Sequence, residues 1–189
     1  MRKLCSYVGL RIAVVPTIVF SMCFPMHSLA DAGDRSSAPY LRAGAIELGL
    51  SGSITVIEGI SRAAVTVRTG TFTQVPGGLA GIEMELSYSH VSSLDWIDLQ
   101  GNLSLQRAWG QSSAYPYIAL GGGLRQEWLG SFRQVRYPVG FNLGLRALVG
   151  QQAALRAEYK FRRILHDPVS NFSEHQLVVG LSIFFKNSR

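Results

Sequence analysis

Three residues near the end of the chain, His166, Ser170 and Glu174, are of the types that together cleave esters. In such a unit the histidine takes the serine proton while the carboxylate orients the imidazole ring. Here three residues, including Pro168, separate the histidine from the serine. This spacing in a loop gives no reason for the imidazole to reach the hydroxyl. We treat the three as candidates, expect a solvated loop histidine, and predict no catalytic residue.

A second pair, His90 and Ser92, is only two residues apart, a spacing that places both side chains on one face of a strand. No carboxylate accompanies the pair in the adjoining sequence, so a surface histidine is again the expectation. No metal-ligand spacing, phosphate-binding glycine loop or nucleic-acid motif is present. The sequence therefore predicts no cofactor, no metal and no nucleic-acid partner.

Charged residues in the last third of the chain fall on alternate positions. From Leu155 to Phe161 the odd positions are apolar or aromatic, whereas the even positions hold Arg156, Glu158 and Lys160. Successive side chains of a strand point to opposite faces, so this alternation predicts a two-faced strand and argues against a helix.

The same alternation recurs from residue 44 onward. Eight segments show it, at about 44–56, 62–75, 78–90, 96–109, 114–128, 136–149, 155–161 and 177–185. The second is the least regular, because its apolar face fades from Val65 and Val67 into threonines. The pattern predicts an all-β fold, a transmembrane up-and-down antiparallel β-barrel of about eight strands. The longer outer loops are expected at 129–135 and 165–174.

The first 30 residues have the features of a cleaved signal peptide. Arg2, Lys3 and Arg11 precede or begin an apolar stretch, and Ser28 and Ala30 offer small residues for cleavage. We expect a signal peptide at 1–30, a periplasmic lead-in at 31–42 and one barrel domain at 43–189. Both cysteines lie in the signal peptide. Its cleavage would also remove three basic residues and lower the formal net charge from +6 to about +3. The high isoelectric point is therefore no argument for nucleic-acid binding.

The direction in which the barrel faces does not follow from alternation alone, because a lipocalin-like barrel has the same two faces turned the opposite way. The polar face is rich in glycine, alanine and serine, which suits the crowded interior of a small barrel. Aromatic residues gather at both strand ends, with Trp109 and Tyr115 at one level and Tyr88 and Tyr137 at the other. Two such girdles are typical of strands that cross a lipid bilayer.

Charged side chains of both signs share the predicted interior. The set is Glu47, Arg68, Glu83, Glu85, Arg125, Glu127, Arg146, Arg156, Glu158 and Lys160. Unpaired charges in a narrow lumen would cost several kcal/mol each, so we expect carboxylates and cations to pair. A paired set plugs the barrel. The alternative is a narrow charge-lined channel, but eight strands leave an interior only wide enough for side chains.

The chain resembles the OmpA/OmpX-type small outer-membrane β-barrels, also described as opacity-like. The residues that carry the resemblance are 116–123, 155–161 and the segment from His175 to the terminal aromatic pair Phe184 and Phe185. Four further residues follow that pair, whereas members of the family typically stop at the aromatic. The resemblance implies insertion into the outer membrane by its assembly machinery.

The expected function is that of a non-enzymatic outer-membrane protein with a charge-plugged lumen, which serves envelope structure or surface contact through its outer loops. Its expected partners are outer-membrane lipids, lipopolysaccharide and the assembly machinery, with no external ligand named. One alternative is a lipid A deacylase-type esterase, since eight-stranded barrels include such enzymes. Those enzymes place the histidine two residues before the serine, a spacing that His166 and Ser170 do not have.

Overall fold

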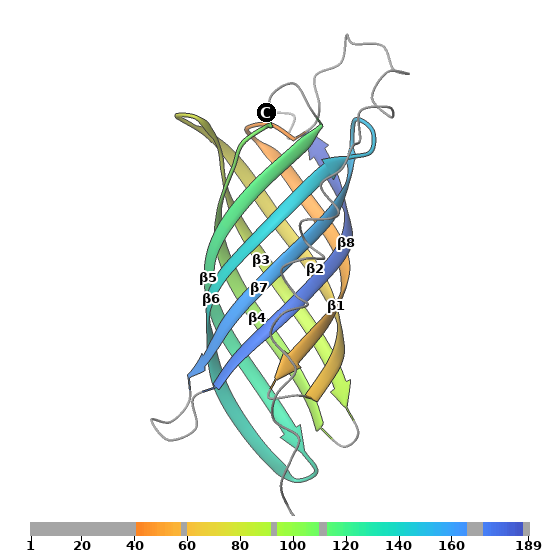
Figure 1. The fold of residues 1–189 in the computed structure, drawn as a ribbon, viewed down its shortest axis with the longest axis vertical. Helices are drawn as coiled ribbons and strands as arrows, with labels where there is room; N and C mark the ends of the chain where they lie inside the picture. Colours follow the sequence, from red (N-terminus) through yellow and green to blue (C-terminus); the bar gives the residue numbers. More distant parts are fainter. Residues whose placement is uncertain (1–40, 58–59, 92–93, 110–112, 166–171, 187–189) are drawn as a thin grey trace, which may run out of the picture. The chain divides into compact units, whose positions relative to one another are not determined.

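The computed structural model describes residues 41–57, 60–91, 94–109, 113–165 and 172–186, and these contain eight strands. The strands are β1 (Ala45–Ile57), β2 (Ile60–Val75), β3 (Gly78–Val91), β4 (Leu94–Gln106), β5 (Ala114–Leu129), β6 (Phe132–Leu148), β7 (Ala153–Leu165) and β8 (Phe172–Lys186). Each strand pairs with its neighbour in sequence, and β1 pairs with β8, which closes the barrel (Figure 1). The predicted all-β, up-and-down antiparallel barrel is confirmed.

Burial along the strands is the reverse of that in a water-soluble protein. Apolar side chains point outward and are exposed, as with Leu103 at 65% and Val179 at 67%, whereas Glu47 and Arg146 point inward and are 0% exposed. The second strand follows the same rule, with Val65 and Val67 outward. None of the described segments is a helix long and apolar enough to cross a membrane.

The barrel has two ends that differ in their connections. At the end we call the terminal end, β1 begins and β8 finishes beside the turn between β2 and β3. At the opposite end, which we call the loop end, the β5–β6 hairpin extends furthest (Figure 1). The prediction of a loop at 129–135 is wrong. Strand pairing continues to Leu129 and Phe132, and a turn at Gly130, with φ of 60°, joins them.

An apolar cluster lies in the interior at the terminal end. Its members are Leu41, Ala45, Phe72, Leu79, Ala154 and Phe184, with Tyr115 and Leu148 packed against them. The Phe72 and Phe184 rings lie 6.2 Å apart between centroids. Tyr115, expected in an aromatic girdle, instead joins this cluster because it lies on the inward face of β5. The cluster lies inside the lumen next to the charged side chains that occupy its centre.

The signal peptide expected at 1–30 lies outside the described residues, as does most of the lead-in expected at 31–42.

Candidate functional site in the barrel lumen

The lumen is built by the inward positions of all eight strands. The register sets Arg68 of β2 opposite Glu85 of β3, so opposite charges face each other across the ladder. Small residues make room for the long side chains. A Cβ atom on Gly144 would lie 2.3 Å from the Tyr117 ring, which shows that this glycine allows the tyrosine to enter the lumen.

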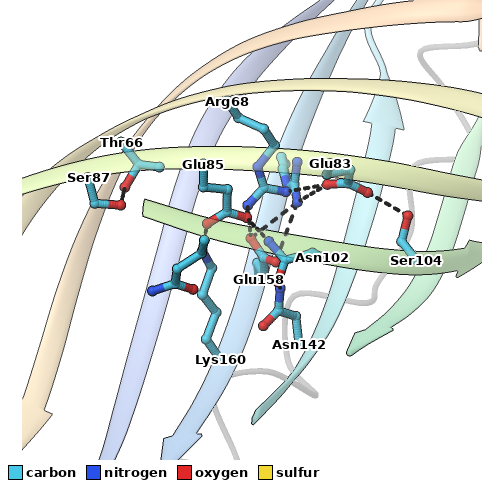
Figure 2. A network of polar contacts seen from close by, with 12 residues as sticks. Thr66, Arg68, Glu83, Glu85, Ser87, Asn102, Ser104, Asn142, Glu158 and Lys160 are labelled. Carbon is cyan, nitrogen blue, oxygen red and sulfur yellow. Dashed lines mark hydrogen bonds and ion pairs between the residues drawn. The ribbon is translucent and has the colours of Figure 1, made fainter. Parts of the chain in front are cut away.

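Eight charged side chains form a central cluster that contains as many cations as carboxylates. Its members are Arg68, Arg146, Arg156, Lys160, Glu47, Glu83, Glu85 and Glu158. All are at most 4% exposed. The cluster is thus a neutral, buried ion network, and Figure 2 shows part of it with the side chains of β2, β3 and β7 converging.

Arg68 and Glu83 each bridge several partners of the central cluster. Arg68 donates to Glu83 at 2.8 Å and to Glu158 at 3.0 Å, and it also pairs with Glu85. Glu83 further accepts from Arg146 at 2.8 Å and from Arg156 at 3.2 Å. Three guanidinium groups therefore converge on a single carboxylate.

The remaining members add further ion pairs and hydrogen bonds to the central cluster. Glu47 pairs with Arg146 and Arg156, each at 3.2 Å. Lys160 donates to Glu85. Arg156 also donates to the Tyr117 hydroxyl at 2.7 Å, and the Arg146 guanidinium lies 4.3 Å from the centre of the Tyr117 ring. Buried ion pairs need such additional hydrogen bonds to offset the loss of hydration.

A second set, the loop-end cluster, consists of Arg62, Arg125, Arg136, Asp98, Glu127 and Glu174. Arg125 donates to both Asp98 and Glu174, and Arg62 donates to Glu174 at 3.0 Å. Arg136 donates to Glu127 at 2.8 Å. This cluster is also balanced in charge.

Sequence reasoning placed Arg125 and Glu127 of the loop-end cluster in the lumen and set Asp98 on the polar face of its strand, but it missed Arg62 and Arg136. Strand parity could have found them, because each lies an even number of positions from a predicted inward residue on its own strand. The inward position of Arg62 was hard to predict because the alternation of apolar and polar residues is least regular in β2. Its guanidinium lies over the buried Trp96 ring, 3.6 Å from the ring centre.

Glu174, proposed from sequence as a loop carboxylate beside His166 and Ser170, lies within β8. Its side chain points into the lumen and accepts hydrogen bonds from Arg62 and Arg125. The expectation that it belongs to the last outer loop is wrong, because β8 begins at Phe172 and its parity directs Glu174 inward. His166 and Ser170 lie outside the described residues.

Arg162 lies inside the barrel without a carboxylate partner among the described residues. It donates to the side-chain oxygens of Gln100 at 3.0 Å and Asn102 at 3.4 Å, and to the backbone carbonyls of Phe141 and Phe161. Because the two clusters are each balanced, Arg162 adds a surplus positive charge to them.

The other sequence candidate, His90, lies on the outward face at the loop end. Its Nδ1 atom is 2.7 Å from Asp95 Oδ1, which also accepts a hydrogen bond from the Tyr88 hydroxyl at 2.8 Å. The absence of a carboxylate inferred from the adjoining sequence is thus wrong. Asp95 is the register partner of His90 across the β3–β4 hairpin, a position that hairpin pairing could have predicted. Ser92 lies outside the described residues.

Among the residues that the structure describes, no three His, Cys, Asp or Glu side chains are grouped as a metal ion would require.

Comparison with protein-family models and with curated protein sequences gives no match. Solved structures do match the fold. Neisserial surface protein A shares 16% identity at a TM-score of 0.55, covering 75% of this chain and 96% of that one. The N-terminal β-barrel domain of Pseudomonas aeruginosa OprF shares 12% identity at a TM-score of 0.58, covering 76% and 98%. The chain therefore has the fold of small outer-membrane β-barrels.

Proposed function

We propose that the protein is an integral outer-membrane β-barrel whose lumen is closed by paired charges, and that it serves envelope structure or surface contact through its loop end. The observation that carries this proposal is the combination of an outward apolar face with a buried ion network. Lipid tails are the environment that an apolar exterior of this extent requires. A water-soluble barrel would have the two faces exchanged.

The energetics of the central cluster support a closed lumen. A water or ion pathway would require side chains such as Arg68 and Glu83 to separate, and breaking a buried pair costs about 3 to 5 kcal/mol. Several pairs would have to open together because three arginines share Glu83. The apolar cluster around Phe72 and Phe184 forms a second obstruction at the terminal end.

The proposed place is the outer membrane, with the loop end outside. The first residue of β1 and the last residue of β8 both lie at the terminal end, which we place toward the periplasm, and the β5–β6 hairpin extends furthest at the opposite end. The proposed partners are accordingly the lipids and lipopolysaccharide around the barrel and the machinery that inserts it. Surface contacts would involve the loop end, where the β5–β6 hairpin projects (Figure 1).

Heat-modifiable migration tests this proposal. The membrane-fraction protein should run at one position on a gel when unheated in SDS and at another after boiling, because a folded barrel resists the detergent. A mobility unchanged by boiling, with the protein recovered from the soluble periplasm, would favour a lipocalin-like barrel instead.

A second candidate, an esterase acting on lipid A, is favoured by one observation. Asp95 holds His90 by its Nδ1 atom, which leaves Nε2 as the ring atom able to accept a proton from a serine. The position of Ser92 is not described, and Glu174 is bound by two arginines in the lumen. The contact between His90 and Asp95 is also explained by hydrogen bonding between neighbouring strands, because the two residues are register partners.

We therefore expect expression in a lipid A-bearing host to leave the lipid A mass spectrum unchanged, since an acid–histidine pair alone provides no nucleophile. Ser92→Ala and Ser170→Ala are the matched controls. Loss of an acyl chain that disappears again with either variant would make this protein an enzyme and contradict the structural role.

A further inference from the structure

The outward face of β7 and β8 changes from apolar to polar near the loop end. Leu155, Ala157, Tyr159 and Phe161 alternate along the outward face of β7 and are followed by Arg163, which is exposed. On β8 the outward residues end in the same way, with Ser173 and His175 beyond Leu177. An arginine on a lipid-facing surface needs an explanation, because its charge is costly away from the interface.

Arg163, Ser173 and His175 lie next to one another across the β7–β8 ladder. Arg163 is the register partner of Ser173, and its Nη1 atom donates to the Ser173 hydroxyl at 3.2 Å. His175 pairs with Phe161, two positions along the same face, and its ring lies 5.4 Å from the Phe161 ring. The three side chains therefore form one small polar surface bounded by apolar residues.

The His175 ring is held in place by a hydrogen bond to a neighbouring side chain. Its Nδ1 atom is 2.6 Å from the Tyr159 hydroxyl, so Nε2 is the ring atom left to meet a ligand. Arg163 retains unused guanidinium donors, since it forms no ion pair within the described part of the chain and its partner on β6 is Val139. The surface thus presents hydrogen-bond donors and a positive charge, with no carboxylate in the register positions beside Arg163.

A phosphate group matches this surface in charge and in geometry. Guanidinium groups bind phosphate oxygens through two parallel hydrogen bonds, and a hydroxyl and an imidazole N–H can donate to the remaining oxygens. In a membrane barrel the boundary between the apolar face and the loop end lies at the level of lipid headgroups. A soluble anion would not need the apolar flank formed by Phe161 and Leu177.

We propose that Arg163, Ser173 and His175 form a binding site for the phosphate of a lipid headgroup in the outer leaflet. This site rests on the proposed function, because it requires the loop end to meet lipid. The apolar residues below it would contact the acyl chains of the same lipid. The site lies on the outer surface and is separate from the two ion clusters of the lumen.

Titration of the folded full-length protein with phosphatidic acid in neutral detergent micelles, followed by native mass spectrometry, tests the site. The wild type should bind phosphatidic acid more tightly than phosphatidylcholine. Arg163→Gln should weaken binding of phosphatidic acid by about tenfold or more, the expected effect of losing charged hydrogen bonds. Arg133→Gln, which removes an exposed arginine from the β5–β6 hairpin, should leave the affinity unchanged.

Several results would overturn the site. If Arg133→Gln weakens the binding of phosphatidic acid as much as Arg163→Gln does, the lipid is attracted to exposed cations in general. If inorganic phosphate competes as strongly as phosphatidic acid does, the site binds free anions. If Arg163→Gln does not fold, the double variant Ser173→Ala with His175→Leu replaces it, and unchanged affinity in that variant contradicts the proposal. Failure of the wild type to show a heat-modifiable band in phosphatidylcholine vesicles would instead contradict the membrane role.

Discussion

Glu83→Gln is expected to destabilise the folded barrel by about 3 to 5 kcal/mol, the cost of removing one partner from a buried ion network. Glu83 accepts hydrogen bonds from Arg68, Arg146, Arg156 and Ser104. Glutamine keeps the shape but removes the charge, so three buried guanidinium groups would lose their shared carboxylate. The midpoint of urea unfolding in lipid vesicles, followed by loss of the unheated gel band, measures the effect.

Arg162→Met provides the matched control, since it also removes one charge from the lumen. Arg162 has neutral partners and is a surplus cation, so its removal should cost much less than the loss of Glu83. Among the described residues, its removal leaves no buried carboxylate without a cation, which is the costly outcome when one partner of a buried ion pair is lost. Equal destabilisation by the two variants would show that packing, and not charge balance, determines the stability of the lumen.

Leu143→Arg is expected to impair folding into lipid. Leu143 lies near the middle of β6, points outward and is 47% exposed. Arginine at the bilayer midplane of a barrel costs about 2 to 4 kcal/mol, a large share of the stability of a small domain. The fraction of protein that acquires the heat-modifiable band in vesicles should fall well below that of the wild type.

Asn142→Leu tests the opposite face at the adjacent position. Asn142 is buried in the lumen, and its amide donates to Asn102 Oδ1 at 3.5 Å, a long hydrogen bond. The substitution should therefore leave insertion into lipid almost unchanged. Normal folding of Leu143→Arg together with failure of Asn142→Leu would mean that the two faces are assigned backwards.

The strands were predictable from sequence because the side-chain period of two is preserved wherever one face is apolar and the other polar. In β3 and β7 the alternation is nearly complete. The boundaries were less certain where polar residues continue a strand beyond its apolar face. Thus the segment at 129–135 was predicted as a loop, although Arg133 and Gln134 continue β6 with regular pairing.

The set of inward charges was predictable, but their partners were not. Parity places Arg68 and Glu83 in the lumen, whereas the contact of Arg68 with Glu158 joins strands far apart in sequence and depends on closure of the barrel. Glu174 was misplaced for a related reason. Its sequence neighbours are typical of a loop, and only the arginines of β2 and β5 show why it lies inside.

Single-channel recording in planar bilayers tests the central claim, a lumen closed by paired charges, most directly. The reconstituted protein should show little steady conductance if, as proposed, the central cluster and the apolar cluster around Phe72 close the lumen. Arg146→Glu, which places a carboxylate beside Glu47 and Glu83, provides a comparison. Large, reproducible conductance steps in the wild type, with an ion selectivity that changes in Arg146→Glu, would contradict the closed lumen and identify the protein as a channel.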